Sequence, residues 1–446
     1  MLENHMMIRR IFPLLLFLMV FSGASSCKKA EIIPEITVSG SLEDISFSGG
    51  EASVDISVNV AWEVRVRYPA GTEEWLTLPA AKGESGDWRF VVRMPENVAH
   101  TREATLVFSL SGASYATNVT VRQLGKLDWD LTDQFDPYFA GFLLKDYTRT
   151  KGGITYEDAI SIKQLNFGSI KALPPSFKGG QFLVNLQVVY MNDNTGTSVD
   201  LGGLSHLKEL DIRNCTFESL DISHNEQLER LNVSDSPIPR IDASHNLNLG
   251  TIGISGPSRD VDIEVVLGAG VRSFYAERRN LKVFDYQNAT ELTDLCLEKC
   301  GVLPSLDLRH TQLDLLYLES IEINGLRLPK TARLVHITNN SGVIPVLELG
   351  PAAWNVQAEE AGIKQILLQD AYNLQYLFCI YNKLEELDFS SAAFPPNLRF
   401  HFNPGKDGIF TLKVAAADYE TKAAEYEGYK WSWDNNGFVY VKVVSE

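Results

Sequence analysis

A period of 21 residues in the apolar positions constrains this chain more than any other feature. Three series of apolar residues share this interval: Leu186, Leu207, Leu228 and Leu249; Val189, Leu210, Leu231 and Ile252; Met191, Ile212, Val233 and Ile254. The register returns at Phe274, Leu295 and Leu316, and again at Leu377 and Leu398. A repeat of this length indicates a solenoid, because one copy cannot bury its apolar side chains without its neighbours. We therefore expect stacked coils over residues 161–404.

The coils carry the motif LxxLxLxxN, seen in LKELDIRNC, LERLNVSDS and LQYLFCIYN. This motif resembles the leucine-rich repeat, and the 21-residue form with two similar halves resembles repeats common in lipoproteins of Bacteroidota. The resemblance implies a leucine-rich-repeat solenoid, and it constrains the fold far more than the function. Proteins of this architecture use an extended face for binding.

One residue of each predicted strand lies between two buried positions and must point outward, because side chains alternate along a strand. Read coil by coil, this column predicts a surface: Tyr190, Asp211, Asn232, Gly253, Tyr275, Cys296, Tyr317, His336, Asn355, Phe378 and Arg399. Its second half is rich in rings, with Tyr376 and His401 one strand step away. Rings bordered by acids suit a sugar or a protein ligand that carries Arg and Lys. The alternative is a solvated sheet surface, since single exposed aromatic residues are common.

Glutamates border the rings at successive coils, at positions 277, 298 and 319. Strands lie about 4.8 Å apart, so stacked carboxylates are unfavourable without a cation or a polar partner. The expected ligand-binding face therefore consists of Tyr190, Tyr275, Tyr317, His336, Tyr376, Phe378, His401, Glu277, Glu298 and Glu319.

A second column, from the other half of each coil, is acidic at eight of ten positions: Asp200, Asp221, Asp242, Asp262, Asp285, Asp307, Arg327, Glu348, Leu367 and Asp388. A cation-binding face is one interpretation. We favour aspartates that stabilise turns by accepting bonds from nearby backbone N–H groups, because they recur wherever the repeat is regular. His224, His245 and His310 share another column, but no third metal ligand is evident beside the first two, so we assign no metal site.

The N-terminus has the layout of a secretory signal peptide over residues 1–26, with two arginines, an apolar run and small residues. The following GASSC resembles the lipobox of bacterial lipoproteins, which implies that Cys27 is the lipidated first residue of the mature chain. A diacylated cysteine anchors a protein to a membrane without spanning it. The resemblance to surface lipoproteins implies lipid anchoring at the outer membrane on the cell surface, through a short linker over residues 27–35.

Short alternating runs such as VDISVNV, WRFVVRM and ATLVFSL fill residues 36–125, which is typical of an all-β, immunoglobulin-like sandwich. The stretch resembles the BACON domain through AWEV, EWLTL and the closing VTVRQLG. The resemblance implies a spacer or an accessory carbohydrate-binding module. We expect Trp62 and Trp75 to pack in the core, and Trp88 to be the better candidate for an exposed ring.

Residues 126–160 resemble the EF-hand-like helical cap that precedes bacterial leucine-rich repeats. Arg149 and Lys151 occupy positions where calcium needs oxygen ligands, so we expect the helices without the calcium. Residues 405–446 read as a β-α-β-β cap with an Asn436-Gly437 turn, in which Trp431 and Trp433 serve the cap.

The net charge of −17 argues against a nucleic-acid binder. No catalytic motif and no cofactor fingerprint is present, and recurrent acids follow the repeat, so we expect no enzymatic activity, no cofactor and no metal. The cysteines after Cys27 show no disulfide spacing and are expected to be buried thiols. The sequence therefore predicts a monomeric surface lipoprotein that binds a glycan or a host or bacterial protein. The alternative is an envelope scaffold that acts only through protein contacts.

Overall fold

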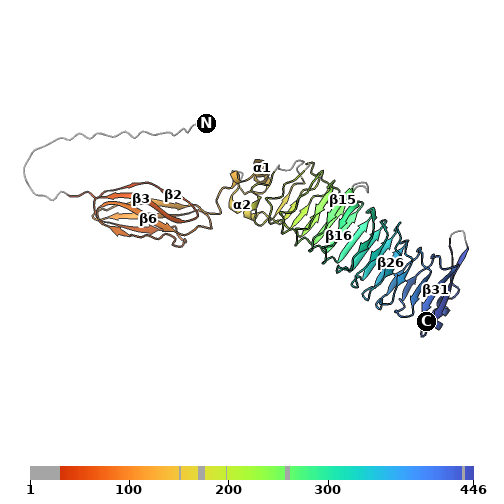
Figure 1. Ribbon diagram of the computed structural model, residues 1–446. Coiled ribbons are helices and arrows are strands. Elements are labelled where there is room, and N and C mark those ends of the chain that lie inside the picture. Colours follow the sequence, from red (N-terminus) through yellow and green to blue (C-terminus); the bar gives the residue numbers. More distant parts are fainter. Residues whose placement is uncertain are drawn as a thin grey trace, which may run out of the picture. The chain divides into compact units, whose positions relative to one another are not determined.

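The computed structural model describes residues 31–149, 152–168, 176–196, 198–256, 262–433 and 437–445 (Figure 1). The expected signal peptide, Cys27, Lys151 and Asn436 lie outside these residues. The chain divides into two compact units, residues 1–126 and 127–446, and each is described by itself. Within the described residues, no helix is both long and apolar enough to cross a membrane.

Two β-sheets form the first unit. One has the order β1-β3-β6 and the other the order β2-β8-β7-β4-β5. The strands are β1 (Ile36–Ser39), β2 (Leu42–Ile45), β3 (Gly50–Val58), β4 (Trp62–Arg67), β5 (Lys82–Gly83), β6 (Gly86–Met94), β7 (Arg102–Leu110) and β8 (Ala116–Gln123). Alternate residues of β3, β6 and β7 are buried and enclose one core with Trp62, Phe90 and Phe108. Trp62 and Trp75 are buried as predicted, whereas Trp88 is 39% exposed.

The second unit begins with short helices that cover the first coils: η1 (Thr132–Gln134), α1 (Pro137–Asp146) and α2 (Tyr156–Ser161). Asp136 caps α1 by accepting bonds from the N–H groups of Tyr138 and Phe139. Asp158 completes a capping box with Thr155 at the start of α2. The apolar residues Phe139, Phe142 and Leu143 of α1 are buried in the solenoid core, and they close this end of the stack.

A solenoid of stacked parallel strands follows, and its longest sheet has 12 strands (Figure 1). We call the outward surface of this sheet the front face. Its strands are β9 (Gln164–Asn166), β10 (Val188–Tyr190), β11 (Glu209–Asp211), β12 (Arg230–Asn232), β14 (Thr251–Ser255), β16 (Ser273–Glu277), β18 (Asp294–Glu298), β21 (Leu315–Glu319), β24 (Leu334–Thr338), β26 (Asn355–Glu359), β28 (Tyr376–Phe378) and β30 (Asn397–Arg399). The residues of the predicted apolar series are buried between this sheet and the opposite side, with Leu398 partly buried, which is consistent with a leucine-rich-repeat solenoid.

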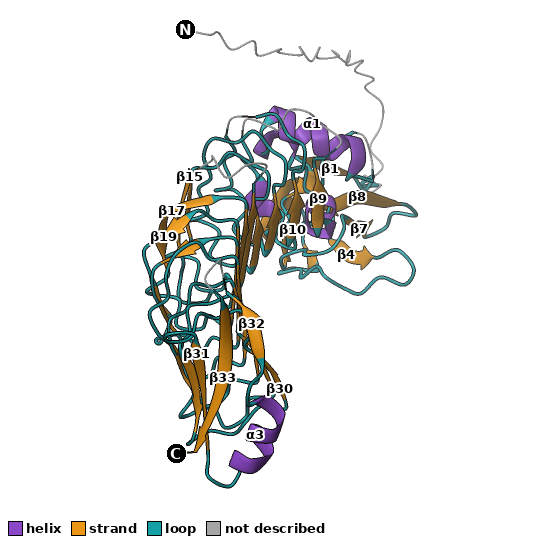
Figure 2. Ribbon diagram, turned by 90° about the vertical axis from the view of Figure 1, so that its right-hand side faces the viewer, coloured by secondary structure: helices purple, strands orange, loops and turns teal. Residues whose placement is uncertain are grey.

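The opposite side of the solenoid carries shorter strands in small groups, and Figure 2 shows the two sides with loops between them. We call its outward surface the back face. The helix η2 (Gly180–Phe182) lies in an early coil. The strands are β13 (Arg240–Asp242), β15 (Asp262–Val266), β17 (Asn280–Asp285), β19 (Val302–Leu303), β20 (Leu306–Asp307), β22 (Glu322–Ile323), β23 (Leu326–Arg327), β25 (Leu347–Glu348) and β27 (Ile366–Leu367).

Buried polar side chains join several coils to the one before, just after the front strand. The Sγ atoms of Cys215 and Cys300 donate to the carbonyls of Met191 and Ala276, at 2.9 and 3.3 Å. Asn403 makes the same kind of bond to the Cys379 carbonyl at 2.9 Å. Cys215, Cys300 and Cys379 are buried and free, as predicted, whereas Cys296 is partly exposed. Two of the thiols thus replace asparagine in a ladder of coil-to-coil bonds.

Several steps of the repeat depart from 21 residues, and unequal steps correct two predicted column positions. Leu316 pairs with Val335, 19 residues on, but the next step returns to 21, so Gln357 and not Asn355 follows His336 in the front column. On the back, a longer coil pairs Asp242 with Val266, which displaces Asp262 from the acidic column. In both cases a turn changed its length, and the apolar pattern of the strands themselves stayed the same.

The C-terminal cap has the predicted β-α-β-β order. It consists of β31 (Ile409–Val414), α3 (Tyr419–Tyr426), β32 (Lys430–Ser432) and β33 (Phe438–Ser445), and it continues the back side from β29 (Glu386–Phe389). Trp431 is buried and its Nε1 donates to the Asn403 carbonyl at 2.9 Å. Trp433 packs against the same core. Both tryptophans therefore serve the cap.

Candidate functional site: the front face of the solenoid

The front face presents three outward columns, one residue of each per coil. The middle column runs Tyr190, Asp211, Asn232, Gly253, Tyr275, Cys296, Tyr317, His336, Gln357, Phe378 and Arg399. Tyr376 belongs to the column two residues upstream. Glu277, Glu298, Glu319 and His401 belong to the column two residues downstream. The parallel register brings most of the predicted residues onto one continuous surface.

The N-terminal half of this surface is dominated by ion pairs between its own side chains. Arg230 bonds to Glu209 of the preceding coil at 2.6 Å. Asp211 is nearly buried and holds Arg213 at 2.9 Å. Tyr190 is half-buried at the start of this charged region and forms no ring stack among the described residues. The charges here are largely satisfied within the protein.

A stacked ring pair marks the middle of the surface. Tyr317 and His336 lie parallel, with centroids 4.5 Å apart and an angle of 3° between the planes. The Tyr317 hydroxyl donates to Glu319, and this bond raises the pKa of Tyr317 to about 12. His336 Nε2 lies 3.3 Å from Thr338 Oγ1. These bonds fix both rings, so they form a rigid platform.

A hollow of about 130 Å³ adjoins this ring pair. Two half-buried leucines, Leu315 and Leu334, point outward and form part of its wall. The side-chain amides of Asn355 and Gln357 complete it, 3.5 Å apart. The hollow therefore combines apolar walls, ring faces and amide donors and acceptors. The lining, apolar with a few polar groups, is of the kind found in ligand sites, while the volume suits a single ring or side chain.

Aromatic side chains cluster over the last three front strands. Tyr376 meets Phe378 edge to face at 6.3 Å, and the Arg399 guanidinium lies 4.7 Å from the centre of the Phe378 ring. Tyr381 and Phe402 stack at 4.5 Å. The set, which we call the C-terminal ring cluster, is Trp354, Tyr376, Phe378, Tyr381, His401 and Phe402.

Sequence reasoning missed Trp354, Tyr381 and Phe402. Tyr381 and Phe402 follow the strand rather than lie in it, at a turn position where φ is 56° and 59°. The same position has positive φ in ten coils, occupied by residues other than glycine. Reading this position coil by coil, as was done for the strand column, would have found both rings.

The stacked glutamates have polar partners, two of them at the same turn position and one in the middle column. Glu277 pairs with Arg278 at 3.1 Å, Glu298 pairs with Lys299, and Glu319 accepts the Tyr317 hydroxyl. The repulsion expected from the sequence is therefore compensated locally. Further along the column, burial and the charge of Arg399 lower the pKa of His401. The negative charge of Glu359 acts in the opposite direction and partly offsets them.

Tyr275 is 43% exposed between Gly253 and Cys296 in the middle column. No ring contact of Tyr275 occurs in the described part of the chain, so it stands apart from the stacked rings. Burial raises the pKa of the Cys296 thiol to about 11, so this cysteine is a neutral, weakly nucleophilic group at neutral pH.

On the back face, the recurrent aspartates bond to their own backbone. Asp221, Asp242 and Asp388 each accept from the N–H group two residues on, at 2.9 to 3.1 Å. Ser244 adds a hydroxyl bond to Asp242 at 2.6 Å. The bonds lower the pKa of Asp221 and Asp242, in each case chiefly through the serine that follows. The turn-stabilising interpretation of the column is confirmed for these residues.

The back-face histidines bond to local groups instead of a common centre. His224 and His245 each meet the preceding serine hydroxyl, at 3.1 and 3.0 Å. His310 bonds to the Tyr286 carbonyl at 3.2 Å. The described residues contain no group of three or more potential ligands that could hold a metal ion.

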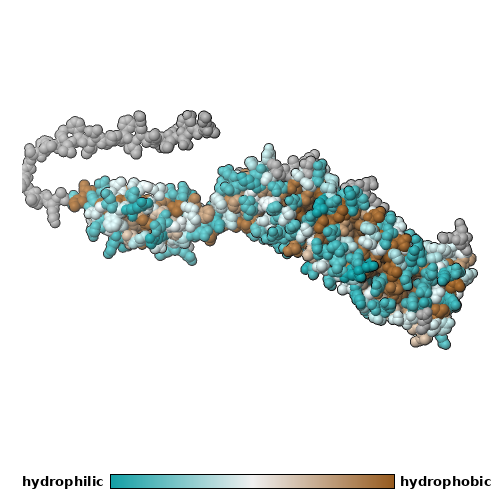
Figure 3. Space-filling view, in the orientation of Figure 1, coloured by the Kyte–Doolittle hydropathy of each residue, from teal (hydrophilic) through white to brown (hydrophobic). Residues whose placement is uncertain are grey.

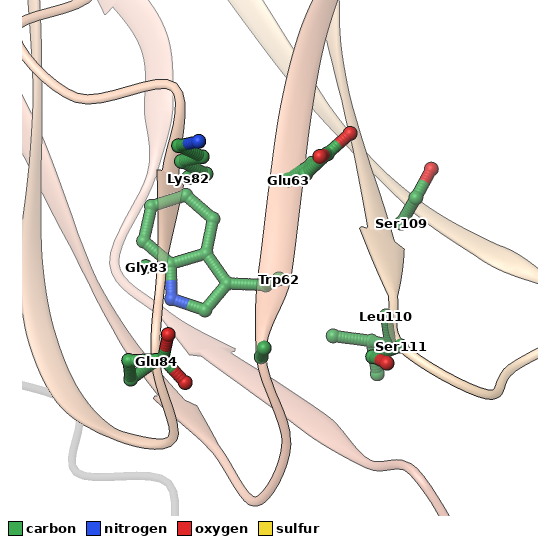
Figure 4. A pocket seen from close by; sticks show the side chains of 9 residues that line it. Trp62, Glu63, Lys82, Gly83, Glu84, Ser109, Leu110 and Ser111 are labelled. Carbon is green, nitrogen blue, oxygen red and sulfur yellow. The ribbon is translucent and has the colours of Figure 1, made fainter.

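The first unit has a separate pocket of about 610 Å³ beside Trp62 (Figure 4). The backbone of Gly83 lies so close to the indole that a Cβ there would be 2.8 Å from ring atoms. Only 2% of Trp62 is exposed, so this pocket offers a polar rim rather than a ring face. Figure 3 shows apolar residues, in brown, scattered among hydrophilic ones along the solenoid. The exposed rings of Tyr275, Trp354 and Tyr381 make the front face the stronger candidate site.

No protein-family model and no curated protein sequence matches the chain. Among solved structures, the functional domain of InlJ from Listeria monocytogenes, which includes a cysteine ladder, is 17% identical and covers 63% of this chain and 72% of its own, with a TM-score of 0.35. The Bacteroides ovatus GH5 xyloglucanase in complex with a XXXG heptasaccharide is 12% identical and covers 71% of each chain, with a TM-score of 0.19. Both similarities are loose.

Proposed function

We propose that this chain is a non-enzymatic binding protein that holds its ligand against the C-terminal half of the front face. The observation that carries this proposal is the difference within one sheet: outward side chains form ion pairs with each other in the early coils and present ring faces in the later ones. Ring faces and an arginine are the groups that most often anchor a partner. A rigid solenoid presents them on a fixed spacing.

A polypeptide is the favoured ligand class. Solenoids of this kind commonly bind proteins along an extended face. Glu359 and the neighbouring Glu360 offer carboxylates beside the C-terminal ring cluster. Lysine and arginine side chains of a partner would find both carboxylates and ring faces there.

A glycan is the second candidate, and the hollow beside Tyr317 and His336 favours it. Sugar rings pack their C–H faces on aromatic rings, and their hydroxyls both donate and accept hydrogen bonds. Asn355 and Gln357 supply amide groups of both kinds at the edge of the hollow.

The proposal includes the setting of the site. Lipidated Cys27 anchors the mature chain at the outer membrane, on the cell surface, and the BACON-like sandwich acts as a spacer or accessory module. The sequence layout of residues 1–27 supports the anchor. Metabolic labelling with a fatty acid, lost in Cys27→Ser, and protease shaving of intact cells test the anchor and the exposure.

Glycan-array and pull-down experiments with residues 28–446 identify the ligand class. We expect one class to bind wild type and to lose most of its binding to the Tyr317→Ala, Phe378→Ala variant. Equal binding by this variant and wild type would contradict the proposed face. No binding in either assay would favour the rival function, a scaffold without a soluble ligand.

A further inference from the structure

One strand of the first unit has an open edge. β6 pairs with β3 along its whole length, from Gly86 to Met94. On its other side, Arg93 exchanges both backbone bonds with Thr77, at 2.8 and 2.9 Å. Outward backbone groups recur at every second residue of a strand. Asp87, Arg89 and Val91 therefore direct their N–H and C=O groups away from β3, and no described residue bonds to them there.

The side chains at this edge leave it accessible. Asp87 accepts the Ser57 hydroxyl at 2.6 Å, and Arg89 Nε donates to Ser53 at 3.1 Å, so both charges lie on the outer surface of their own sheet. Trp88 points to the opposite face, where it is 39% exposed and meets Trp62 edge to face. An exposed strand of this kind is a template for pairing with another strand.

We propose that two copies of this chain pair through β6, antiparallel, about a two-fold axis at Trp88. In this register Asp87 of each copy lies opposite Arg89 of the other, and each such pair exchanges both N–H···O bonds. The opposed side chains carry opposite charges, and the two Trp88 rings face each other across the axis. The surface is self-complementary, as a two-fold interface requires. This differs from the monomer expected from the sequence.

The charges and Thr77 select this register over its neighbours. An axis at Arg89 would place the two Arg89 side chains opposite each other, and like charges directly opposite destabilise a pair. An axis at Phe90 would place Asp87 opposite Arg93, whose backbone groups are already bonded to Thr77. Charges on an edge strand commonly prevent pairing. Here Asp87 and Arg89 carry opposite charges two residues apart. They oppose strand pairing in the register with its axis at Arg89 and favour pairing in the register with its axis at Trp88.

Sedimentation equilibrium of residues 28–446, which retain every described residue, tests the proposal. We expect a reversible dimer whose Kd rises about tenfold or more in Asp87→Arg and in Arg89→Asp, because two attractive pairs become repulsive. The double variant D87R/R89D restores the pairs and should recover the wild-type Kd. An equimolar mixture of the two single variants should form a heterodimer, since one carries two arginines and the other two aspartates at the edge.

Arg89→Pro tests the backbone pairing itself, because it removes an outward backbone N–H and no backbone bond to β3. Among the described residues, the only bond to β3 that it removes is the exposed one from the Arg89 side chain to Ser53. We expect it to abolish dimerisation while the far-UV circular dichroism and the melting temperature of the chain stay unchanged. A wild-type chain that stays monomeric at hundreds of micromolar would overturn the proposal. So would a dimer that survives all these variants, or a double variant that fails to recover.

Discussion

The two faces of the solenoid repeat at the same interval and use the repeat differently. On the back, one residue type recurs, and each aspartate bonds to the backbone two residues on. On the front, the equivalent position changes from Tyr190 and Asp211 to Tyr317, His336 and Phe378. A side chain that builds the coil must recur with the coil, whereas a side chain that meets a ligand must vary with the ligand. Departure from the repeat is therefore the better indicator of a binding site.

The largest expected effect separates the two halves of the front face. Phe378→Ala combined with Tyr381→Ala should lower ligand affinity about 100-fold, because truncated anchor rings typically cost a few kcal/mol. Tyr190→Ala, in the same column but in the ion-paired half, serves as the matched control and should change affinity less than about threefold. Titration calorimetry with the ligand found in the binding screens measures both. Comparable losses in the two variants would place the ligand along the whole face.

A smaller effect is expected on the back face, in stability instead of binding. Asp242→Ala removes the bonds from the N–H and hydroxyl of Ser244 and should lower the free energy of unfolding by about 1 kcal/mol. Ligand affinity should stay unchanged. Urea denaturation followed by fluorescence measures the first, and calorimetry the second. A loss of affinity without a loss of stability would mean that the back face also meets the ligand.

The contribution of Asp307, on the back face, to the free energy of unfolding should depend on pH. The Arg309 side chain lowers the pKa of Asp307 to about 2. A carboxyl whose folded pKa is depressed stabilises the fold above its unfolded pKa, about 3.9, and this contribution is lost as pH falls through 2. The stability difference between wild type and Asp307→Asn should be constant above about pH 5 and shrink as pH falls through this window. A difference that does not vary with pH would assign the stabilisation to packing.

The smallest effect is expected on the front face at high pH. The bond to Glu319 raises the pKa of Tyr317 to about 12, so the neutral phenol stabilises the fold below about pH 10 and this contribution is lost as pH rises through 12. In Glu319→Gln the pKa of Tyr317 should fall towards its ordinary value. Difference absorbance near 295 nm, with Tyr317→Phe to assign the signal, follows this titration. An unchanged titration would show that burial, and not the bond, raises the pKa.

Much of this organisation could be predicted from the residues, because the repeat fixes both burial and direction. Once Leu210 and Ile212 are inside, Asp211 must point out, and the same holds in every regular coil. The back-face aspartates were predictable for a related reason, since their bonds are local and reach only two residues along the chain. Local chemistry of this kind leaves its full signature in the sequence.

The features that could not be predicted depend on the lengths of turns and on which strands pair in a sheet. On the front face one step of 19 residues is followed by a return to 21, which puts Gln357 and not Asn355 in the column, and a turn can absorb two residues without any apolar signal. Trp354 and Tyr381 reach the front from turns, where strand alternation does not apply. The open edge of β6 follows from the sheet order β1-β3-β6, which arises from contacts between distant segments.

The turn position with positive φ gives a way to raise the thermal stability of this protein. Arg278, Lys299, Glu360, Tyr381 and Phe402 all hold a positive φ. Glycine reaches that conformation without the steric cost, of about 1 kcal/mol, that other residues bear. Replacing Ser320 and Asn339, which hold the same position with φ of 53° and 52°, by glycine would raise the melting temperature in small increments. The paired glutamates, Glu360 and the C-terminal ring cluster would stay intact. Such a chain would be a thermally hardened scaffold that still carries its recognition surface.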